Sequence, residues 1–222
     1  FGAEALRRLL RDPVEVYWRD RLGVTLRDPA QAIEDDEPFE LDALQRYQLG
    51  SDLAMQLHAV PDSDVLRDPR LQGLLPLAAS GEALALALQD QARALVQRAE
   101  DTAQRYPTLL PRQSYVIDLD GQPLDFALDG LRRDAQDNLL KLCLRPSNLE
   151  SDKFGISIDK LCTYWLDHVL LCAAGKSLLT VVVGLDRVVQ WPALAQADAL
   201  EQLRQWHQLW QQAWQAPAPA AR

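Results

Sequence analysis

The stretch from Leu128 to Arg145, LDGLRRDAQDNLLKLCLR, decides the fold. Apolar and polar residues alternate on both sides of a turn at Asp137-Asn138, and such a period of two predicts a pair of antiparallel strands. These strands carry arginine and the thiol of Cys143 where a metal site would need carboxylates. A hard divalent ion such as Mg²⁺ needs oxygen ligands, and a guanidinium repels it. The stretch therefore predicts a strand pair that holds no metal ion.

Further strands and helices are expected around this pair. The alternation extends it into an antiparallel meander, and an amphipathic helix ending at Gly175 then leads to a buried strand. One more short strand and a final helix follow. The expected strands are Ser114–Leu119, Pro123–Arg133, Leu139–Arg145, Leu178–Val183 and Arg187–Trp191, and the expected helices are Ile158–Ala174 and Ala193–Trp214. The sequence thus predicts an α/β core.

Three helical segments are expected ahead of the strands. Glu4–Arg21 has helical spacing and is expected to be interrupted at Pro13, with Asp12 as the cap of its second part. Phe39–Leu57 resumes the helical spacing, and the Ala/Leu-rich run Gly81–Tyr106 is expected to be the central packing helix. The chain is accordingly divided into a helical annex at residues 1–72, the α/β core at 73–215 and an Ala/Pro linker tail at 216–222.

Composition limits the functions that the chain can serve. Its 222 residues carry a formal net charge of −9, so any contact with DNA is expected to be local rather than a general phosphate clamp. No apolar run is long enough to cross a bilayer, and we expect a cytoplasmic protein with no membrane partner. The acidic segment Pro29–Pro38 is expected to be a solvated loop rather than a metal site. Because the first residue is Phe1, we expect a segment of a longer chain.

The other residues with reactive or aromatic side chains favour structural roles. The three cysteines lie in apolar patterns without paired spacing, which favours buried, reduced thiols. The three histidines lack zinc-binding spacing, and the sequence has no phosphate-binding glycine motif or nucleophile elbow. Trp206, Trp210 and Trp214 recur at every fourth position of the final helix and so share one face. Packing explains this stripe better than base stacking, because Arg204 alone is basic nearby.

Short motifs follow one another along nearly the whole chain. They are RDPV at 11–14, RLGV at 21–24, EPFEL at 37–41, LQRYQ at 44–48, GLLP at 73–76, DNLL at 137–140, RPS at 145–147, WLDH at 165–168 and LCAAG at 171–175. In order and spacing this set resembles the carboxy-terminal region of the RecC family, the gamma subunits of exodeoxyribonuclease V. A match of this length is more specific than any one of its pieces.

The resemblance implies a restriction-endonuclease-like core, similar to PD-(D/E)xK nucleases, with a mixed sheet flanked by helices and without catalytic residues. Where active relatives bind metal, this chain has Ala85, Arg133, Cys143 and Arg145, which we call the vestigial positions. A methyl group, a thiol and two guanidinium groups do not supply the anionic oxygen that Mg²⁺ requires. Asp12 stands where an iron–sulfur ligand would precede a proline. We therefore expect no metal and no cofactor.

The function implied by the resemblance is that of a non-catalytic domain in a RecBCD helicase-nuclease complex, which acts in double-strand break repair and homologous recombination. Such a domain organises RecB-type and RecD-type subunits and guides DNA strands. The candidate DNA contacts are Arg132, Arg133 and Arg145. Because successive strand residues face opposite sides of a sheet, one of the neighbouring pair faces inward, where an ion pair with an acid is favoured over a phosphate.

Two other functions stay open. A magnesium-dependent nuclease could use displaced acids, namely Asp125, Asp129, Asp134 and Asp137, although turn or surface positions explain these residues more simply. The chain could also be a scaffold that binds proteins but no DNA. Cleavage that depends on Asp129 or Asp134, salt-sensitive DNA binding, and co-purification without DNA affinity distinguish the three.

Overall fold

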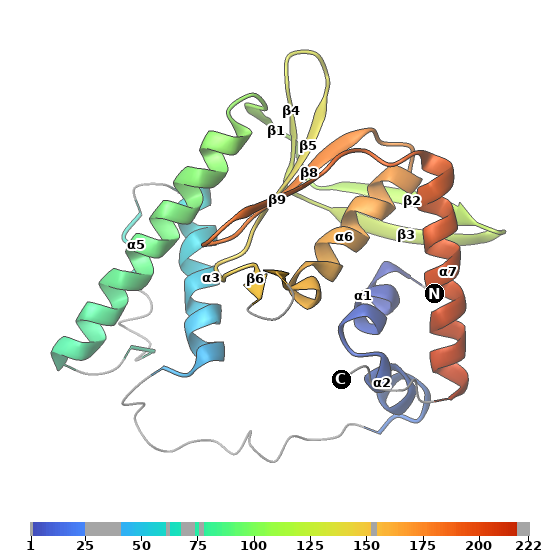
Figure 1. The fold of residues 1–222 in the computed structure, drawn as a ribbon, viewed down its shortest axis with the longest axis horizontal. Coiled ribbons are helices and arrows are strands. Elements are labelled where there is room, and N and C mark those ends of the chain that lie inside the picture. Colours follow the sequence, from blue (N-terminus) through green and yellow to red (C-terminus); the bar gives the residue numbers. More distant parts are fainter. Residues whose placement is uncertain are drawn as a thin grey trace.

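A five-stranded mixed sheet forms the centre of the chain (Figure 1). The computed structural model describes residues 2–24, 41–60, 63–67, 74–75, 78–151 and 155–216. In spatial order the strands are β1 (Thr108–Leu109), β4 (Leu131–Arg133), β5 (Leu139–Leu144), β8 (Leu178–Val183) and β9 (Val188–Trp191). β5 and β8 are parallel, and all other neighbours are antiparallel.

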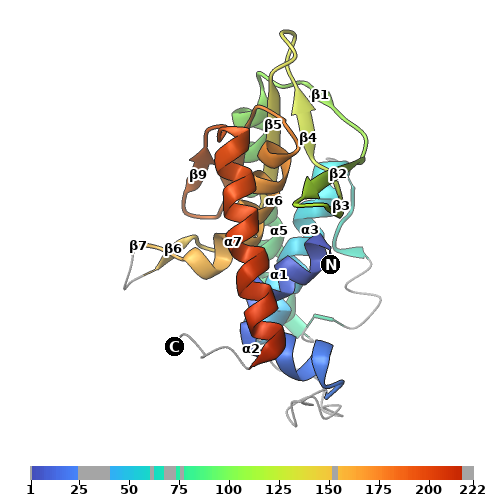
Figure 2. The same ribbon diagram turned by 90° about the vertical axis from the view of Figure 1, so that its right-hand side faces the viewer.

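Helices cover both faces of this sheet. α3 (Ala43–Ala59) and α5 (Ala78–Ala103) lie side by side on one face, and α6 (Ile158–Ala173) lies on the other with α1 (Ala3–Arg11) and α7 (Gln196–Gln215) outside it (Figures 1 and 2). Along the chain, the helix α5 precedes the antiparallel strands β4 and β5. The crossover helix α6 then leads to β8, which is parallel to β5. This order is the restriction-endonuclease-like arrangement predicted from the sequence, and the predicted fold class is confirmed.

The predicted meander is wrong in one respect, because the segment Pro123–Arg133 is two strands instead of one. β2 (Gln113–Leu119) and β3 (Gln122–Leu128) form a separate two-stranded sheet, and only β4 joins the central sheet. The break lies at Gly130, whose φ of +67° favours glycine and whose missing Cβ would lie 3.1 Å from the carbonyl oxygen of Leu142. The buried apolar residues are at even positions up to Leu128 and at an odd position, Leu131, after the break, so the period of two changes phase here and the prediction of one strand overlooked it.

Several short elements were not predicted. β1, β6 (Glu150–Ser151) and β7 (Gly155–Ile156) each have two residues, which is too short for periodicity to indicate. The opening helix is interrupted at Pro13 as expected, and the amide of Val14 donates to the side chain of Asp12 at 3.0 Å, which confirms the cap. α2 (Pro13–Glu15) then continues into a π-helix, η1 (Val16–Arg21), in place of the expected α-helix.

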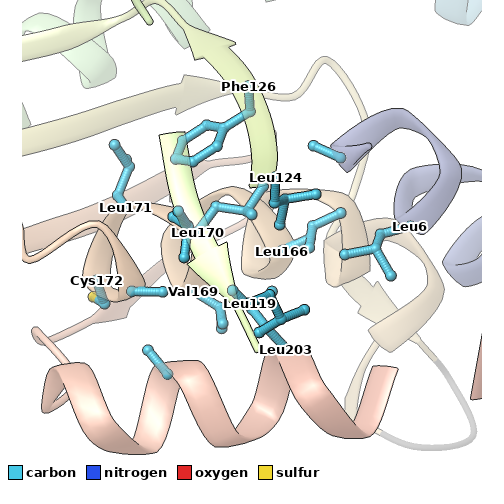
Figure 3. Packing of buried hydrophobic residues seen from close by; sticks show 14 of the residues in the cluster. Leu6, Leu119, Leu124, Phe126, Leu166, Val169, Leu170, Leu171, Cys172 and Leu203 are labelled. Atoms are coloured by element: carbon cyan, nitrogen blue, oxygen red, sulfur yellow. The ribbon is translucent and has the colours of Figure 1, made fainter. Parts of the chain in front are cut away.

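α6 is the central helix of the fold, and the prediction that gave this role to the segment 81–106 is wrong. Its residues Leu166, Leu170 and Leu171 are fully buried, and Figure 3 shows them among side chains of β2, β3, α1 and α7. α5 instead lies at the outside of the sheet and has a solvent-exposed side. The Ala-rich composition of α5 signals helix propensity, whereas the burial of α6 follows from the continuous apolar run at residues 169–173 in its last turns.

α6 ends as the sequence predicts. The amide of Gly175 donates to the carbonyl of Cys172 and that of Lys176 to the carbonyl of Leu171, both at 3.0 Å. Gly175 has a φ of +76°, so this pair of bonds is a Schellman motif closed by glycine. The turn directs the chain into β8.

The helices of the expected annex are divided between the two faces of the sheet. α1 belongs to the apolar cluster around α6, and α3 belongs to the cluster between α5 and the sheet. The domain boundary at residue 72 stays a prediction. The acidic segment 29–38 and tail residues 217–222 lie outside the described residues. In the part of the chain that the structure describes, no helix has the length and apolar character needed to span a membrane.

The tryptophan stripe of α7 serves packing, as expected. Trp206, Trp210 and Trp214 are partly buried against the cluster around α6, and the ring centroids of Trp210 and Trp214 lie 5.2 Å apart. Arg21 of η1 donates to the carbonyl oxygen of Trp214 at 3.0 Å. The stripe therefore joins the amino-terminal helices to α7.

Candidate functional site: cations on the central strands

Arg132 of β4 faces α5 and forms an ion pair with Glu100 of that helix. Its Nη1 and Nη2 atoms donate to the two carboxylate oxygens at 3.1 and 2.7 Å, which is a bidentate arrangement. The side chain of Arg132 is 11% exposed, and its Nε has no hydrogen-bond partner among the described residues. The expected inward-facing arginine is thus Arg132, and it has the ion pair that the sequence favoured.

His58 of α3 extends this pair into a three-residue cluster. Its Nδ1 lies 3.0 Å from Oε1 of Glu100. Burial is the main cause that lowers the pKa of His58; the carboxylate of Glu100 opposes the shift and the guanidinium of Arg132 adds to it. The cluster joins α3, α5 and β4 through one carboxylate.

A Glu100→Gln substitution is expected to lower the free energy of unfolding by about 1–3 kcal/mol, because the guanidinium of Arg132 would stay buried without a counter-charge. Urea denaturation of the two proteins measures the loss. Asp90→Asn is the matched control on the same helix: Asp90 is exposed and 3.9 Å from Arg93, so its loss should cost less than about 0.5 kcal/mol. Equal losses in the two variants would contradict the buried-pair account.

Arg133 lies at the end of β4 and faces solvent. Its side chain is 46% exposed, and its Nη1 lies 3.1 Å from the carboxylate of Asp137 in the β4–β5 turn. Arg133 pairs across the ladder with Leu139, at the start of β5, whereas Cys143 lies near its end. The structure therefore does not bring these two vestigial positions together.

Lys141 is the charged residue that the sequence analysis missed. It is 5% exposed, lies opposite Leu131, and donates from Nζ to the backbone carbonyl oxygen of Asp129. The same Nζ is 3.7 Å from a carboxylate oxygen of Asp129, whose side chain is 81% exposed. A lysine inside the run LLKLCL, in phase with Cys143, was the available signal, because alternate strand residues face the same side.

Cys143 and Arg145 occupy the second half of β5 and the residue after it. Burial raises the pKa of the Cys143 thiol to about 12, and Leu161 of α6 belongs to the same apolar cluster. Arg145 lies over the ring of Tyr47, with its guanidinium carbon 5.1 Å from the ring centroid. Its Nε donates to the hydroxyl of Ser147 at 3.1 Å. Neither position offers a carboxylate.

Ala85 lies on the other side of the sheet from Cys143. It is fully buried in α5, in the cluster that contains Leu140 and Leu142, whereas Cys143 alternates with these residues and faces α6. The four vestigial positions therefore do not converge in the structure. Within the described residues, no group of three histidine, cysteine, aspartate or glutamate side chains is placed to hold a metal ion.

The acids considered for a displaced site are separated. Asp134 is in the β4–β5 turn, where Asn138 donates to both of its oxygens and Gln136 to one. The hydrogen bond from the Asn138 side chain is the main cause that lowers the pKa of Asp134. Asp137 has a φ of +65° in the same turn, and Asp125 pairs with Val116 in the separate β2–β3 sheet. The turn explanation is confirmed for Asp134 and Asp137.

The cysteines are free, and two of the three are buried as expected. Cys143 and Cys172 lie in the interior, whereas Cys162 is only partly buried near the start of α6. Burial also raises the pKa of Cys162 and of Cys172. The prediction of a buried thiol is therefore wrong for Cys162 alone.

His168 of α6 is fully buried behind the central sheet. Its Nδ1 is 2.8 Å from the hydroxyl of Thr180 on β8, and its ring stacks on Trp165 with centroids 5.2 Å apart. Burial lowers its pKa from the ordinary 6.5. These contacts are structural, as the sequence favoured for the histidines.

The stability of the fold is expected to fall on mild acidification because of this histidine. Since the pKa of folded His168 is below 6.5, the unfolded chain binds a proton first as the pH falls through 6.5. The contribution of this group to the free energy of unfolding should be level above about pH 7.5, and below that it should fall by at most about 1.4 kcal/mol per pH unit. Urea denaturation of wild type and His168→Asn across this range measures it. An unchanged slope in the variant would contradict the assignment.

Comparisons of the sequence with known proteins agree on one family. A family model described as the RecC C-terminal domain matches residues 2–222. The chain is 31% identical over 204 residues to the RecBCD enzyme subunit RecC of Escherichia coli strain K12, an alignment that covers 91% of this chain and 17% of that protein. It is 33% identical over 87 residues to RecBCD enzyme subunit RecC of Haemophilus influenzae, which covers 39% of this chain and 8% of that protein.

Both alignments span less than a fifth of the relative's length. Among solved structures, a chain from Eubacterium rectale that is provisionally named an exonuclease aligns with a TM-score of 0.41 and 13% identity. That alignment covers 94% of this chain and 84% of the other.

Proposed function

Because the chain belongs to the RecC C-terminal domain family, we propose that it is a non-catalytic domain of a RecBCD-type complex acting in double-strand break repair and recombination. In this role it organises RecB-type and RecD-type subunits and guides separated DNA strands. Phosphodiester cleavage and ATP hydrolysis take place in other subunits. The relatives support the assignment to a complex, since both are named as subunits of the RecBCD enzyme.

The observation that carries the non-catalytic assignment is the charge on the central strands. Arg132 of β4 and Lys141 of β5 are both buried, and they place a positive charge on each face of the strand pair. A divalent cation needs anionic oxygen ligands at this place and is repelled by buried ammonium and guanidinium groups. Glu100, the carboxylate next to Arg132 on the α5 face, already accepts both hydrogen bonds from that guanidinium.

A protein-binding scaffold is the second candidate function, and one surface supports it. An apolar groove of about 740 Å³ lies between β7, β9, α6 and α7. Ile156 and Ile158 stand at its edge with 38% and 76% of their surface exposed, and Trp165, Trp191 and Trp206 line it. Exposed apolar surface of this kind is typical of protein-binding sites. Contact with another subunit is part of both proposals, and DNA binding distinguishes them.

The experiment is to co-purify the chain with RecB-type and RecD-type subunits and to measure the binding of forked DNA at several salt concentrations. We expect a stable complex whose DNA affinity decreases with salt. Among the three candidate arginines, Arg133 is the exposed one, and Arg133→Gln should reduce the slope of log K against log salt by about 1 if it contacts a phosphate. Complex formation without a change of DNA affinity on mutation of this chain would favour the scaffold.

A further inference from the structure

A second groove lies on the opposite side of the sheet from the apolar one. It runs between α3, α5 and the loops that follow β5 and β8, and its volume is about 570 Å³. Arg46, Tyr47, Gln91 and Ser147 bring polar groups to its wall, and leucine and alanine side chains form the rest. The volume is within the range of about 300–1,000 Å³ that is typical of small-ligand sites, so a nucleotide-sized group fits and a duplex does not.

The arginines around this groove have no acidic partner. Arg46 donates from Nε to the carbonyl oxygen of Leu41 at 3.0 Å, and Arg145 donates to the hydroxyl of Ser147. Arg98 donates to the carbonyl oxygens of residues 184 and 185, both at 2.9 Å. Within the described ranges, no carboxylate lies within ion-pair distance of these three side chains, whereas Arg132 on the same face of the sheet has Glu100. Their positive charge is therefore available to an anionic ligand.

The nearest acid on the loop after β8 is already occupied. Both carboxylate oxygens of Asp186 accept backbone amides, from Leu149 at 2.7 Å and Glu150 at 2.8 Å. One of them also lies 3.8 Å from the guanidinium of Arg187. The carboxylate of Asp186 thus stabilises its own loop and forms no ion pair with Arg46, Arg98 or Arg145 among the described residues. The result is a local positive surface on a chain whose formal net charge is −9.

Tyr47 adds an aromatic surface to this charge. Its ring is half-buried, lines the groove, and has the guanidinium of Arg145 on one side. Aromatic rings next to cations are the usual platform for unpaired bases, because every base has a flat face and every nucleotide carries a phosphate. Gln91 and Ser147 supply hydrogen-bonding groups at the same wall.

We propose that this groove binds an unpaired segment of a nucleic acid strand, with a base against Tyr47 and a phosphate at Arg46. The proposal rests on the proposed function in strand guidance and locates a contact for it. It differs from the candidates drawn from the sequence, since neither Arg46 nor Tyr47 was among them and Arg132 and Arg133 lie elsewhere. Single strands are selected because a stacked pair presents no free base face to the ring.

The test measures binding of a fluorescein-labelled oligothymidylate to the full chain by anisotropy. Tyr47→Leu is expected to weaken binding by about 5- to 150-fold, the loss of one stacked base, and Tyr47→Phe should restore it because stacking needs only the ring. Arg46→Gln should weaken binding and reduce its salt dependence. Arg204→Gln, an arginine on α7 outside the groove that pairs with Asp120, should leave binding within about twofold of wild type. Circular dichroism confirms that each variant is folded.

A strand of the same length with abasic sites separates the two contacts. With this probe Tyr47→Leu should have no effect, whereas Arg46→Gln should still weaken binding. Equal loss with both probes would overturn the stacking contact and indicate an anion site only. If Arg133→Gln weakens oligothymidylate binding and Tyr47→Leu does not, the groove proposal fails while strand guidance stands. No binding by the wild-type chain, alone or with RecB-type and RecD-type subunits, would overturn both.

Discussion

A Lys141→Glu substitution is expected to destabilise the fold by about 3–5 kcal/mol. Lys141 is 5% exposed, and its ammonium group lies next to both the carbonyl oxygen and the carboxylate of Asp129. A glutamate there would place a buried negative charge next to these oxygens without a counter-ion. Urea denaturation at neutral pH measures the change.

Lys141→Met is the matched control for this charge reversal. Methionine keeps an apolar stem of similar length, and Asp129 is exposed enough to be solvated once its partner is lost. The variant should therefore lose about 1 kcal/mol, the net value of one hydrogen bond. Equal losses in the two variants would show that side-chain shape rather than charge determines this position.

Leu166→Ala should lower the free energy of unfolding by about 2–5 kcal/mol. Leu166 is fully buried in α6, and Figure 3 shows it in the same cluster as Leu6 of α1 and Leu124 of β3. Its loss leaves a cavity where three parts of the fold meet, and the surrounding helices cannot close it completely.

Leu209→Ala on α7 is the control for this core substitution, because Leu209 is 52% exposed. It should change stability by less than about 0.5 kcal/mol. Chemical denaturation of both variants tests whether α6 is the centre of the fold. A loss below about 1 kcal/mol for Leu166→Ala would contradict that role.

Much of the fold could be predicted because its signals are local. β5 and β8 are each marked by a six-residue run that is almost wholly apolar, α6 has helical spacing, and Gly175 marks the end of α6 directly. The break at Gly130 was missed although the apolar positions change phase there, because the glycine alone does not say which strand each half joins. The central place of α6 depends on what packs around it, which sequence periodicity does not specify.

The candidate site was predicted less well, because its contacts join elements that are far apart in the sequence. That one of the two neighbouring arginines turns inward follows from strand geometry, but its partner Glu100 is 32 residues away on another element. Arg133 and Cys143 were related by motif spacing, yet the ladder pairs Arg133 with Leu139. Lys141 was passed over because it lies between the residues that the motif selected. The residue types thus indicated the chemistry of each position, but the sequence did not show which of these residues lie close together in the fold.

The most direct test of the account is cleavage by the purified chain itself. Single- and double-stranded DNA are incubated with the chain and Mg²⁺ or Mn²⁺, next to an Asp129→Asn variant and a chelator control. The account predicts product at the level of the chelator control for both proteins and both metals, because buried cations occupy the central strands. Metal-dependent cleavage that purifies with the wild-type chain and is lost in Asp129→Asn would contradict it.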